Sequence, residues 1–177
     1  MRESLVEFGR RLVAGGFVVG ADGNLSVRHG ESILITPSAL RYERMTEKDI
    51  VSIDLDGRGL SSRSSEWAVH CEIYRERPEV HAVIHAHPVH ACVLAVRGEN
   101  LKPLLDEVGP VLGGDIRVAA HAPSGSMELA RNAAVALAGR QAVILANHGV
   151  VTVGESLEEA FYRLEVLERV AQVQVRL

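Results

Sequence analysis

Hydrophobic and polar residues follow helical and strand periodicities in turn along this chain of 177 residues. Apolar residues repeat at helical spacing from Leu5 to Val13, which predicts an amphipathic helix that ends at Gly15-Gly16. Two short strands, over residues 25–28 and 33–35, flank a turn at His29-Gly30 and predict a hairpin. A single helical turn over 46–49 then leads to a third strand over 50–54.

The rest of the chain alternates helices with buried strands. Helices are predicted over 66–77, 89–96 and 127–138, and a last helix begins at a capping box formed by Ser156 and Glu159. Strands are predicted before Pro88 and over 116–118, 142–145 and 150–153, whereas 102–114 matches neither period. No linker or repeat divides the chain, so we expect one α/β domain over residues 1–177, with a mixed sheet covered by helices.

Composition limits the possible partners of this domain. Hydrophobic residues make up 47% and charged residues 24%, which is typical of globular proteins. The net charge of −4, without a run of Lys or Arg, argues against nucleic acid as a partner. The N-terminus lacks the apolar region of a signal peptide, and Cys71 and Cys92 fit no C-x-x-C pattern. We therefore expect a cytoplasmic protein with reduced thiols and no membrane partner.

Four histidines fall within residues 81–90. Val83 and Ile84 favour a buried strand, on which His85 and His87 point from the same face, ~7 Å apart at their Cα atoms. Such a pair can bind one metal ion; the alternative is two polar residues on a solvated strand edge. His81 points from the same face of the strand as His85 and His87, but it lies further back along the strand. His90 belongs to the helix that follows.

Glu66 and His148 extend this pair to a possible zinc site. Glu66 falls in a first helical turn, where a carboxylate also favours the helix dipole. His148 falls in a tight turn between two apolar strands, where it could simply bind a backbone carbonyl. Together with His85 and His87 they provide three imidazoles and a carboxylate, a donor set that suits Zn²⁺.

Several small polar residues could bind an anion. Gly23 and Asn24 lie in a turn whose backbone N–H groups can form a concavity, and Ser64 and Ser65 lie at a helix start. Ser38 ends a strand and could add a hydroxyl. Each of these positions is also ordinary in a turn, a helix cap or a surface loop.

Five motifs in order make the chain resemble the class II aldolase/adducin family, and within it the enzymes that cleave L-fuculose 1-phosphate. They are Gly-Asn-Leu-Ser-Val-Arg at 23–28, Ile-Thr-Pro-Ser at 35–38, Ser-Ser-Glu at 64–66, His-Ala-His at 85–87 and Asn-His-Gly at 147–149. The resemblance implies a largely antiparallel sheet and one Zn²⁺ per subunit. It also implies metal ligands at Glu66, His85, His87 and His148, and a phosphate site at Gly23, Asn24, Ser38, Ser64 and Ser65.

The reaction implied by the resemblance is the cleavage of a ketose 1-phosphate. Its products are dihydroxyacetone phosphate and an aldehyde such as L-lactaldehyde, formed through an enediolate that the metal stabilises. Glu66 then acts as the base as well as a ligand. Relatives of this kind are homotetramers with active sites near subunit interfaces, so we expect a homotetramer.

One segment departs from the aldolase pattern. Glu107, beside Asp106, stands where the aldolases carry a tyrosine, which suggests a catalytic role for Glu107 and a position facing the metal of a neighbouring subunit. An acidic residue here is similar to dehydratase and 4-epimerase members, which remain an alternative, as does a non-catalytic adducin-like domain. Glu66, rather than an aspartate, favours the aldolase over the epimerase.

Overall fold

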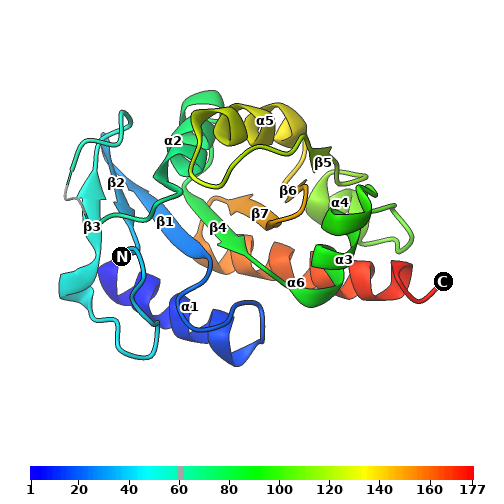
Figure 1. Cartoon of the computed structure of the whole chain (residues 1–177), viewed down its shortest axis with the longest axis horizontal. Helices are drawn as coiled ribbons and strands as arrows, with labels where there is room; N and C mark the ends of the chain where they lie inside the picture. Colours follow the sequence, from blue (N-terminus) through cyan, green and yellow to red (C-terminus); the bar gives the residue numbers. More distant parts are fainter. Residues whose placement is uncertain (60–61) are drawn as a thin grey trace.

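The computed structural model describes residues 1–59 and 62–177, which form a β-sheet covered by helices on both faces (Figure 1). The strands are β1 (Asn24–His29), β2 (Ser32–Ile35), β3 (Val51–Ile53), β4 (Ala82–Ala86), β5 (Val118–Ala119), β6 (Ala142–Leu145) and β7 (Gly149–Gly154). The helices are α1 (Arg2–Ala14), η1 (Glu47–Asp49), α2 (Trp67–Glu76), α3 (Val89–Arg97), α4 (Val108–Leu112), α5 (Met127–Leu137) and α6 (Leu157–Gln174).

The strands of the described sheet follow the order β3-β2-β1-β4-β7-β6-β5. All neighbours are antiparallel except β5 and β6, which are parallel because α5 connects them as a crossover. The expectation of an α/β fold with a mixed, largely antiparallel sheet is therefore confirmed. β4 lies at the centre of this order, between β1 and β7.

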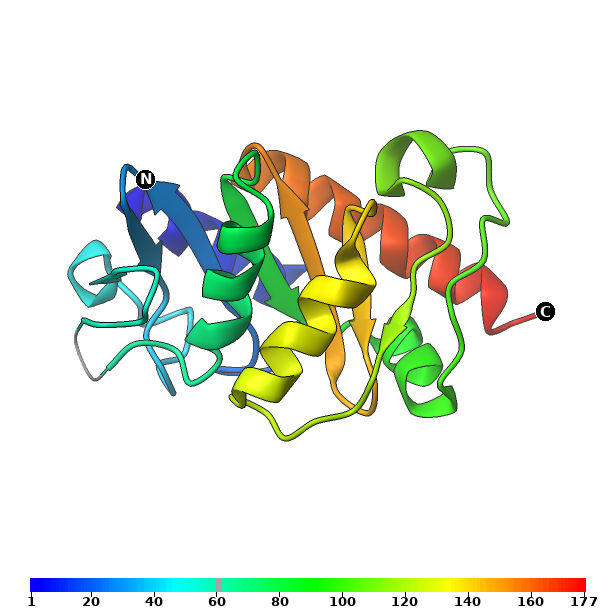
Figure 2. The same cartoon turned by 90° about the horizontal axis from the view of Figure 1, so that it is seen from above.

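Each face of the sheet has its own hydrophobic core. α2 and α5 lie side by side over one face, as Figure 2 shows, and pack on alternate residues such as Val83 and Val143. α1, α3 and α6 cover the other face, where Ile84 and Ile144 meet the inward side of α6. The inward residues predicted for that last helix are buried: Leu157, Phe161, Leu164 and Leu167.

The structure assigns one segment that the sequence left open and corrects two local predictions. Residues 102–114 contain the short helix α4, which no period in the sequence indicates because Gly109 and Pro110 interrupt it; packing against α6 stabilises it instead. The predicted strand 116–118 is shifted, since β5 begins at Val118 while Ile116 bridges to Leu101.

The capping box of α6 is only half formed. The Ser156 hydroxyl accepts a hydrogen bond from the Glu159 N–H at 3.2 Å. The Glu159 carboxylate, however, accepts from the N–H of Glu155 at 2.7 Å rather than from that of Ser156. The reciprocal bond of the predicted box is thus displaced by one residue.

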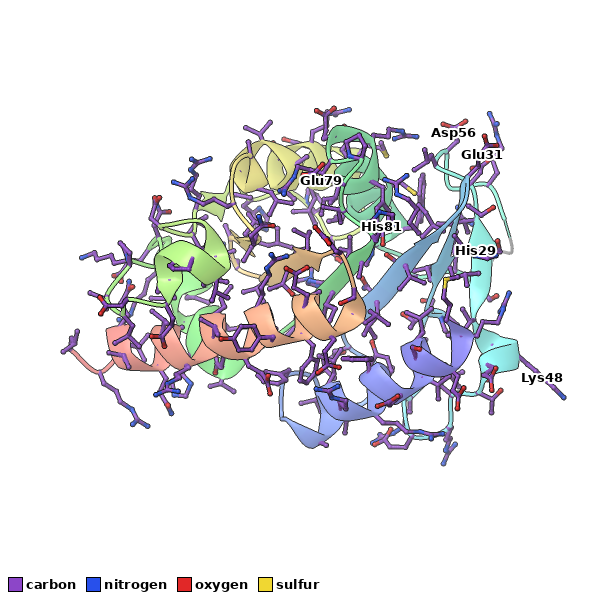
Figure 3. All side chains as sticks on the ribbon, turned by 180° about the vertical axis from the view of Figure 1, so that it is seen from behind. His29, Glu31, Lys48, Asp56, Glu79 and His81 are labelled. Carbon is purple, nitrogen blue, oxygen red and sulfur yellow. The ribbon has the colours of Figure 1, made fainter. Side chains whose placement is uncertain are left out.

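No helix in the described ranges is long and apolar enough to span a membrane. His81, labelled in Figure 3, comes just before β4 and is exposed, so it lies at the far end of this strand from His85.

Candidate metal and phosphate site

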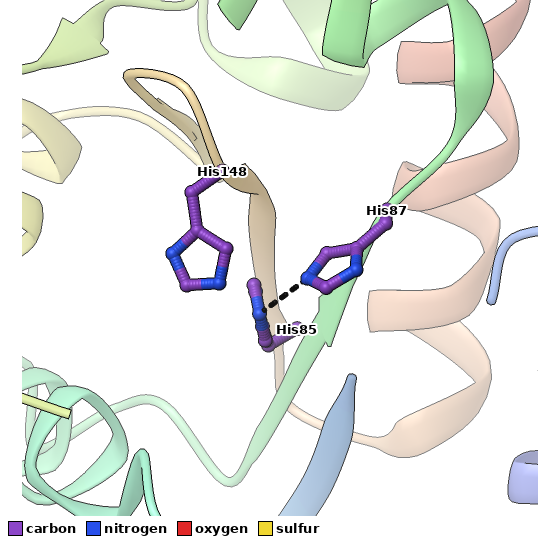
Figure 4. A group of neighbouring side chains, drawn as sticks. All are labelled: His85, His87 and His148. Carbon is purple, nitrogen blue, oxygen red and sulfur yellow. Dashed lines mark hydrogen bonds between the residues drawn. The ribbon is translucent and has the colours of Figure 1, made fainter. Parts of the chain in front are cut away.

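Three histidine side chains converge at the end of β4 (Figure 4). His85 belongs to β4, His87 follows it directly, and His148 lies in the turn between β6 and β7. One ring nitrogen from each lies within 4.8 Å of the other two, and the Nε2 atoms of His85 and His87 are 3.0 Å apart. The strand parity seen in the sequence thus brings His85 and His87 together, and the β6–β7 turn adds His148.

The sheet fixes the orientation of the His85 ring. Its Nδ1 lies 2.9 Å from the carbonyl oxygen of Val150, on the neighbouring strand β7. A carbonyl oxygen can only accept, so Nδ1 carries the proton. In the neutral ring, the lone pair of Nε2 then points into the histidine cluster, which is the form that binds a metal.

The β6–β7 turn brings His148 close because two neighbouring residues suit a tight path. Asn147 adopts a left-handed conformation with φ of 57°, which asparagine tolerates better than most residues. Gly149 leaves space: a Cβ at this position would lie 2.4 Å from Cδ2 of His87 and 2.5 Å from the carbonyl oxygen of Ala86. The absence of a side chain at Gly149 therefore allows the histidines to approach one another.

Glu66 faces the histidines from the N-terminus of α2. Its Oε2 lies 2.9 Å from Nε2 of His85, and its Oε1 lies 3.3 Å from Nε2 of His148. Burial would raise the pKa of this carboxyl group, but the charge and hydrogen bond of His85 in its protonated form, together with the charge of His148, outweigh burial and lower the pKa well below its usual range. Glu66 is therefore a carboxylate in the site.

The convergence of these atoms fits a bound cation. With Nδ1 of His85 donating to Val150, the lone pair of its Nε2 faces a carboxylate oxygen at 2.9 Å, which is repulsive unless a proton or a cation lies between them. Three imidazoles and one carboxylate form the donor set of a catalytic zinc site. The four residues would hold a divalent ion in this position.

Two further residues bind the carboxylate of Glu66. The Ser124 hydroxyl donates to Oε1 at 2.7 Å, and the Asn24 amide donates to Oε2 at 3.1 Å. The sequence did not indicate Ser124, which comes from the loop before α5; its only signal is its place in a Pro-Ser-Gly segment. Asn24 was predicted to bind phosphate, but its side chain amide is directed to Glu66.

A cavity of about 190 Å³ opens beside the candidate metal ligands. The residues predicted to bind phosphate all line it: Gly23, Asn24, Ser38, Ser64 and Ser65. Gly23 has a φ of 69°, and a Cβ there would lie 2.5 Å from the carbonyl oxygen of His85, so a glycine is required for packing as well. Among the described residues that line this cavity, none is Lys or Arg, and Asp22 adds a carboxyl group.

Glu107 lies outside this cavity. It directly precedes α4, which packs against α6, and it is not among the described residues that line the site. Asp106 is exposed beside it. Within one copy of the chain, the structure does not bring Glu107 to Glu66 or the histidines, so its predicted role would require a second subunit.

Comparison with known proteins identifies the family. The model of the Class II Aldolase and Adducin N-terminal domain matches residues 3–175. The chain belongs to this family. It is 40% identical over 174 residues to a 5-methylthioribulose-1-phosphate/5-deoxyribulose-1-phosphate aldolase of Rhodospirillum rubrum, covering 97% of this chain and 79% of the relative. It is 34% identical over 160 residues to the L-fuculose phosphate aldolase of Escherichia coli, covering 89% of this chain and 74% of that relative.

Solved structures agree with this family. An L-fuculose 1-phosphate aldolase superposes with a TM-score of 0.93 at 38% identity, over 97% of this chain and 83% of that one. The L-fuculose-1-phosphate aldolase of Thermus thermophilus superposes with a TM-score of 0.90 at 32% identity, over 98% of this chain and 92% of that one. The prediction of a carbon–carbon lyase of the class II aldolase family is confirmed.

Proposed function

We propose that this protein is a zinc-dependent aldolase that cleaves a ketose 1-phosphate to dihydroxyacetone phosphate and an aldehyde. The observation that carries the proposal is the convergence of Glu66, His85, His87 and His148 beside a small polar cavity. When bound, the divalent ion supplies a Lewis acid that stabilises negative charge on the oxygens next to the bond that breaks.

Glu66 is the residue that moves a proton. Cleavage breaks the bond between C3 and C4 of the ketose; the proton of the C4 hydroxyl leaves as the aldehyde forms, and C3 takes up a proton to give dihydroxyacetone phosphate. The ionised Glu66 removes this last proton in the reverse direction; in cleavage it first takes up one proton, which balances the one that the C4 hydroxyl releases to solvent, and then delivers it to C3. Ser124 and Asn24 bind both of its oxygens and so hold the carboxylate toward the cavity.

The phosphate group would lie at the end of the cavity formed by Gly23, Ser38, Ser64 and Ser65. Backbone N–H groups and serine hydroxyls bind phosphate without a cationic side chain. An adjoining cavity of about 240 Å³ shares the three serines and adds Arg63, whose guanidinium lies over the ring of Trp67 at 5.1 Å. Arg63 would complement the charge of the phosphate from this side. These contacts fix the reacting carbons beside the metal ligands.

The names of the relatives indicate a narrower class of ketose phosphates as substrates. One is named for 5-methylthioribulose and 5-deoxyribulose 1-phosphates, and others for L-fuculose phosphate. All three are ketoses without a hydroxyl on the terminal carbon. We propose a substrate of this class for this chain, and an assembly into a homotetramer in the cytoplasm, in which Glu107 could reach a neighbouring subunit.

A substrate panel with metal analysis tests the proposal. Purified protein is analysed for bound metal, then incubated with the 1-phosphates of L-fuculose, 5-deoxyribulose and 5-methylthioribulose, with free L-fuculose as the control. Dihydroxyacetone phosphate is detected by its enzymatic reduction. We expect release from at least one phosphate and none from the free sugar, and loss of release in Glu66→Gln. Zinc-loaded protein that releases nothing from any of them contradicts the proposal; water loss or epimerisation instead would support the dehydratase or epimerase alternative.

A further inference from the structure

A buried chain of hydrogen bonds runs from Glu66 away from the cavity and into the core between the sheet and α2. The carboxylate of Glu66 contacts Asn24, the Asn24 amide contacts Nε2 of His70, and Nδ1 of His70 lies 2.7 Å from the Ser26 hydroxyl. The Ser26 hydroxyl in turn lies 2.9 Å from that of Tyr74. All five residues are buried, and His70 and Ser26 are completely inaccessible.

The direction of each bond near Glu66 follows from what each atom can do. An ionised carboxylate only accepts, so the Asn24 amide must turn its NH₂ group toward Glu66. The carbonyl oxygen of Asn24 then faces His70, and because this oxygen also only accepts, Nε2 of His70 must carry a proton.

The directions of the remaining hydrogen bonds follow from a neutral His70. Burial lowers the pKa of His70 to about 3, so the ring has a single proton, on Nε2. Nδ1 is then an acceptor, and the Ser26 hydroxyl donates to it. Its oxygen remains free to accept from Tyr74. Each hydrogen bond of this series is therefore donated in the direction of Glu66.

We infer that His70 is a positioning residue for the proposed aldolase site, which acts by holding the Asn24 amide in the one orientation that donates to Glu66. A flipped amide would place its oxygen against the carboxylate and repel it. Glu66 would then lose its fixed position relative to His85 and His148, which lie 2.9 and 3.3 Å from its two oxygens. This inference rests on the proposed function, and it gives the Asn24 side chain a role other than phosphate binding.

Two substitutions of His70 separate this role from simple core packing. His70→Gln can place an amide N–H near the position of Nε2 and keep the bond to Asn24, whereas His70→Asn is too short to reach it. Tyr74→Phe removes only the outermost donor, 48 residues from Ser26 in sequence, and serves as the matched control. Melting temperatures show whether each variant is folded.

The readouts are the zinc dissociation constant, from competition with a chelating dye, and kcat and KM on the best substrate of the panel. We expect His70→Asn to weaken zinc binding and to lower kcat, each by about 10- to 100-fold, with KM little changed. His70→Gln should recover most of both losses, and Tyr74→Phe should stay close to the wild type. A folded His70→Asn with unchanged zinc affinity and kcat would overturn the inference.

The tautomer of His70 gives a test that needs neither a variant nor turnover. Nitrogen-15 NMR of histidine-labelled wild-type protein should show His70 neutral with its proton on Nε2. A proton on Nδ1 would overturn the inference even if the aldolase activity is found. Conversely, a protein that cleaves no sugar phosphate leaves this test and the zinc measurement decisive, so the two proposals fail separately.

Discussion

The hydroxyl of Ser124 donates a hydrogen bond to Oε1 of Glu66 at 2.7 Å, across 58 residues of sequence. A hydrogen bond to a charged group contributes about 1.5–3 kcal/mol. Ser124→Ala should therefore lower kcat/KM by roughly tenfold or more and lower the melting temperature by only a few degrees, because solvent replaces part of the lost contact at this exposed loop position. Steady-state kinetics and calorimetry measure the two. Ser124→Thr, which keeps a hydroxyl, is the control; equal activity of wild type and Ser124→Ala would contradict the assigned contact.

Removal of a single histidine should remove the metal. His87→Ala and His148→Ala each delete one of the converging nitrogens, and we expect less than one equivalent of zinc and a loss of activity of about a thousandfold. His81→Ala is the matched control, because His81 precedes the same strand but is exposed at its other end. Elemental analysis after dialysis measures the metal. Full zinc occupancy in His148→Ala would exclude His148 as a ligand.

Glu168 stabilises the helix that follows the histidine strand. Its carboxylate accepts from the backbone N–H groups of His90 and Ala91, both at 2.9 Å, and from Nδ1 of His90 at 2.7 Å. It thus caps α3 from a distant element, because the N-cap residue Pro88 offers no side chain acceptor. Glu168→Ala should lower the free energy of unfolding by about 1–2 kcal/mol.

Denaturant titration measures this loss, and Glu165→Ala, an exposed position on the same helix, is the control. Because α3 begins at Val89, two residues after His87, Glu168→Ala should also weaken zinc binding. If both variants unfold at the same denaturant concentration, Glu168 does not cap α3.

Ala39 adopts a left-handed conformation with φ of 57° and lines the cavity beside the candidate metal ligands. This conformation costs about 1–2 kcal/mol for a residue with a Cβ. A glycine avoids that cost, but its greater backbone freedom in the unfolded chain offsets about 0.5–1 kcal/mol of the stabilisation. Ala39→Gly should therefore raise the melting temperature by about 2 °C in calorimetry. Ala134→Gly, inside α5, should lower it instead. A lower melting temperature for Ala39→Gly would show that no strain is relieved there.

Cys71 should resist alkylation in the folded protein. It is buried, and burial raises the pKa of its thiol to about 12. Since only the thiolate reacts, labelling by iodoacetamide should stay slow from pH 7 to 9 and become fast on unfolding. Mass spectrometry should find Cys92, which is half-buried, modified first. Labelling of Cys71 at the rate of the unfolded chain would contradict its burial.

Most of the fold and part of the site could be predicted from the sequence. Period-two alternation places His85 and His87 on one face, and the inward stripe of α6 is plain from its spacing. Residue type alone made His148 and Glu66 candidate ligands, and the family motifs strengthened both, because each is ordinary in its own turn. The hydrogen bonds that connect Glu66 with His70 through Asn24 were not predicted. Asn24 lies 42 positions from Glu66 and 46 from His70 in sequence, and these residues meet only when β1 packs beside α2.

At Gly149, beside the histidine cluster, the structure leaves no room for a side chain. Gly149 has open space neither toward His87 nor toward the backbone of Ala86, so any other residue would push the histidine rings apart. A library that randomises residues 147–149 should therefore recover Gly149 as strictly as His148 among active clones. Selection at this turn would act on volume as much as on chemistry.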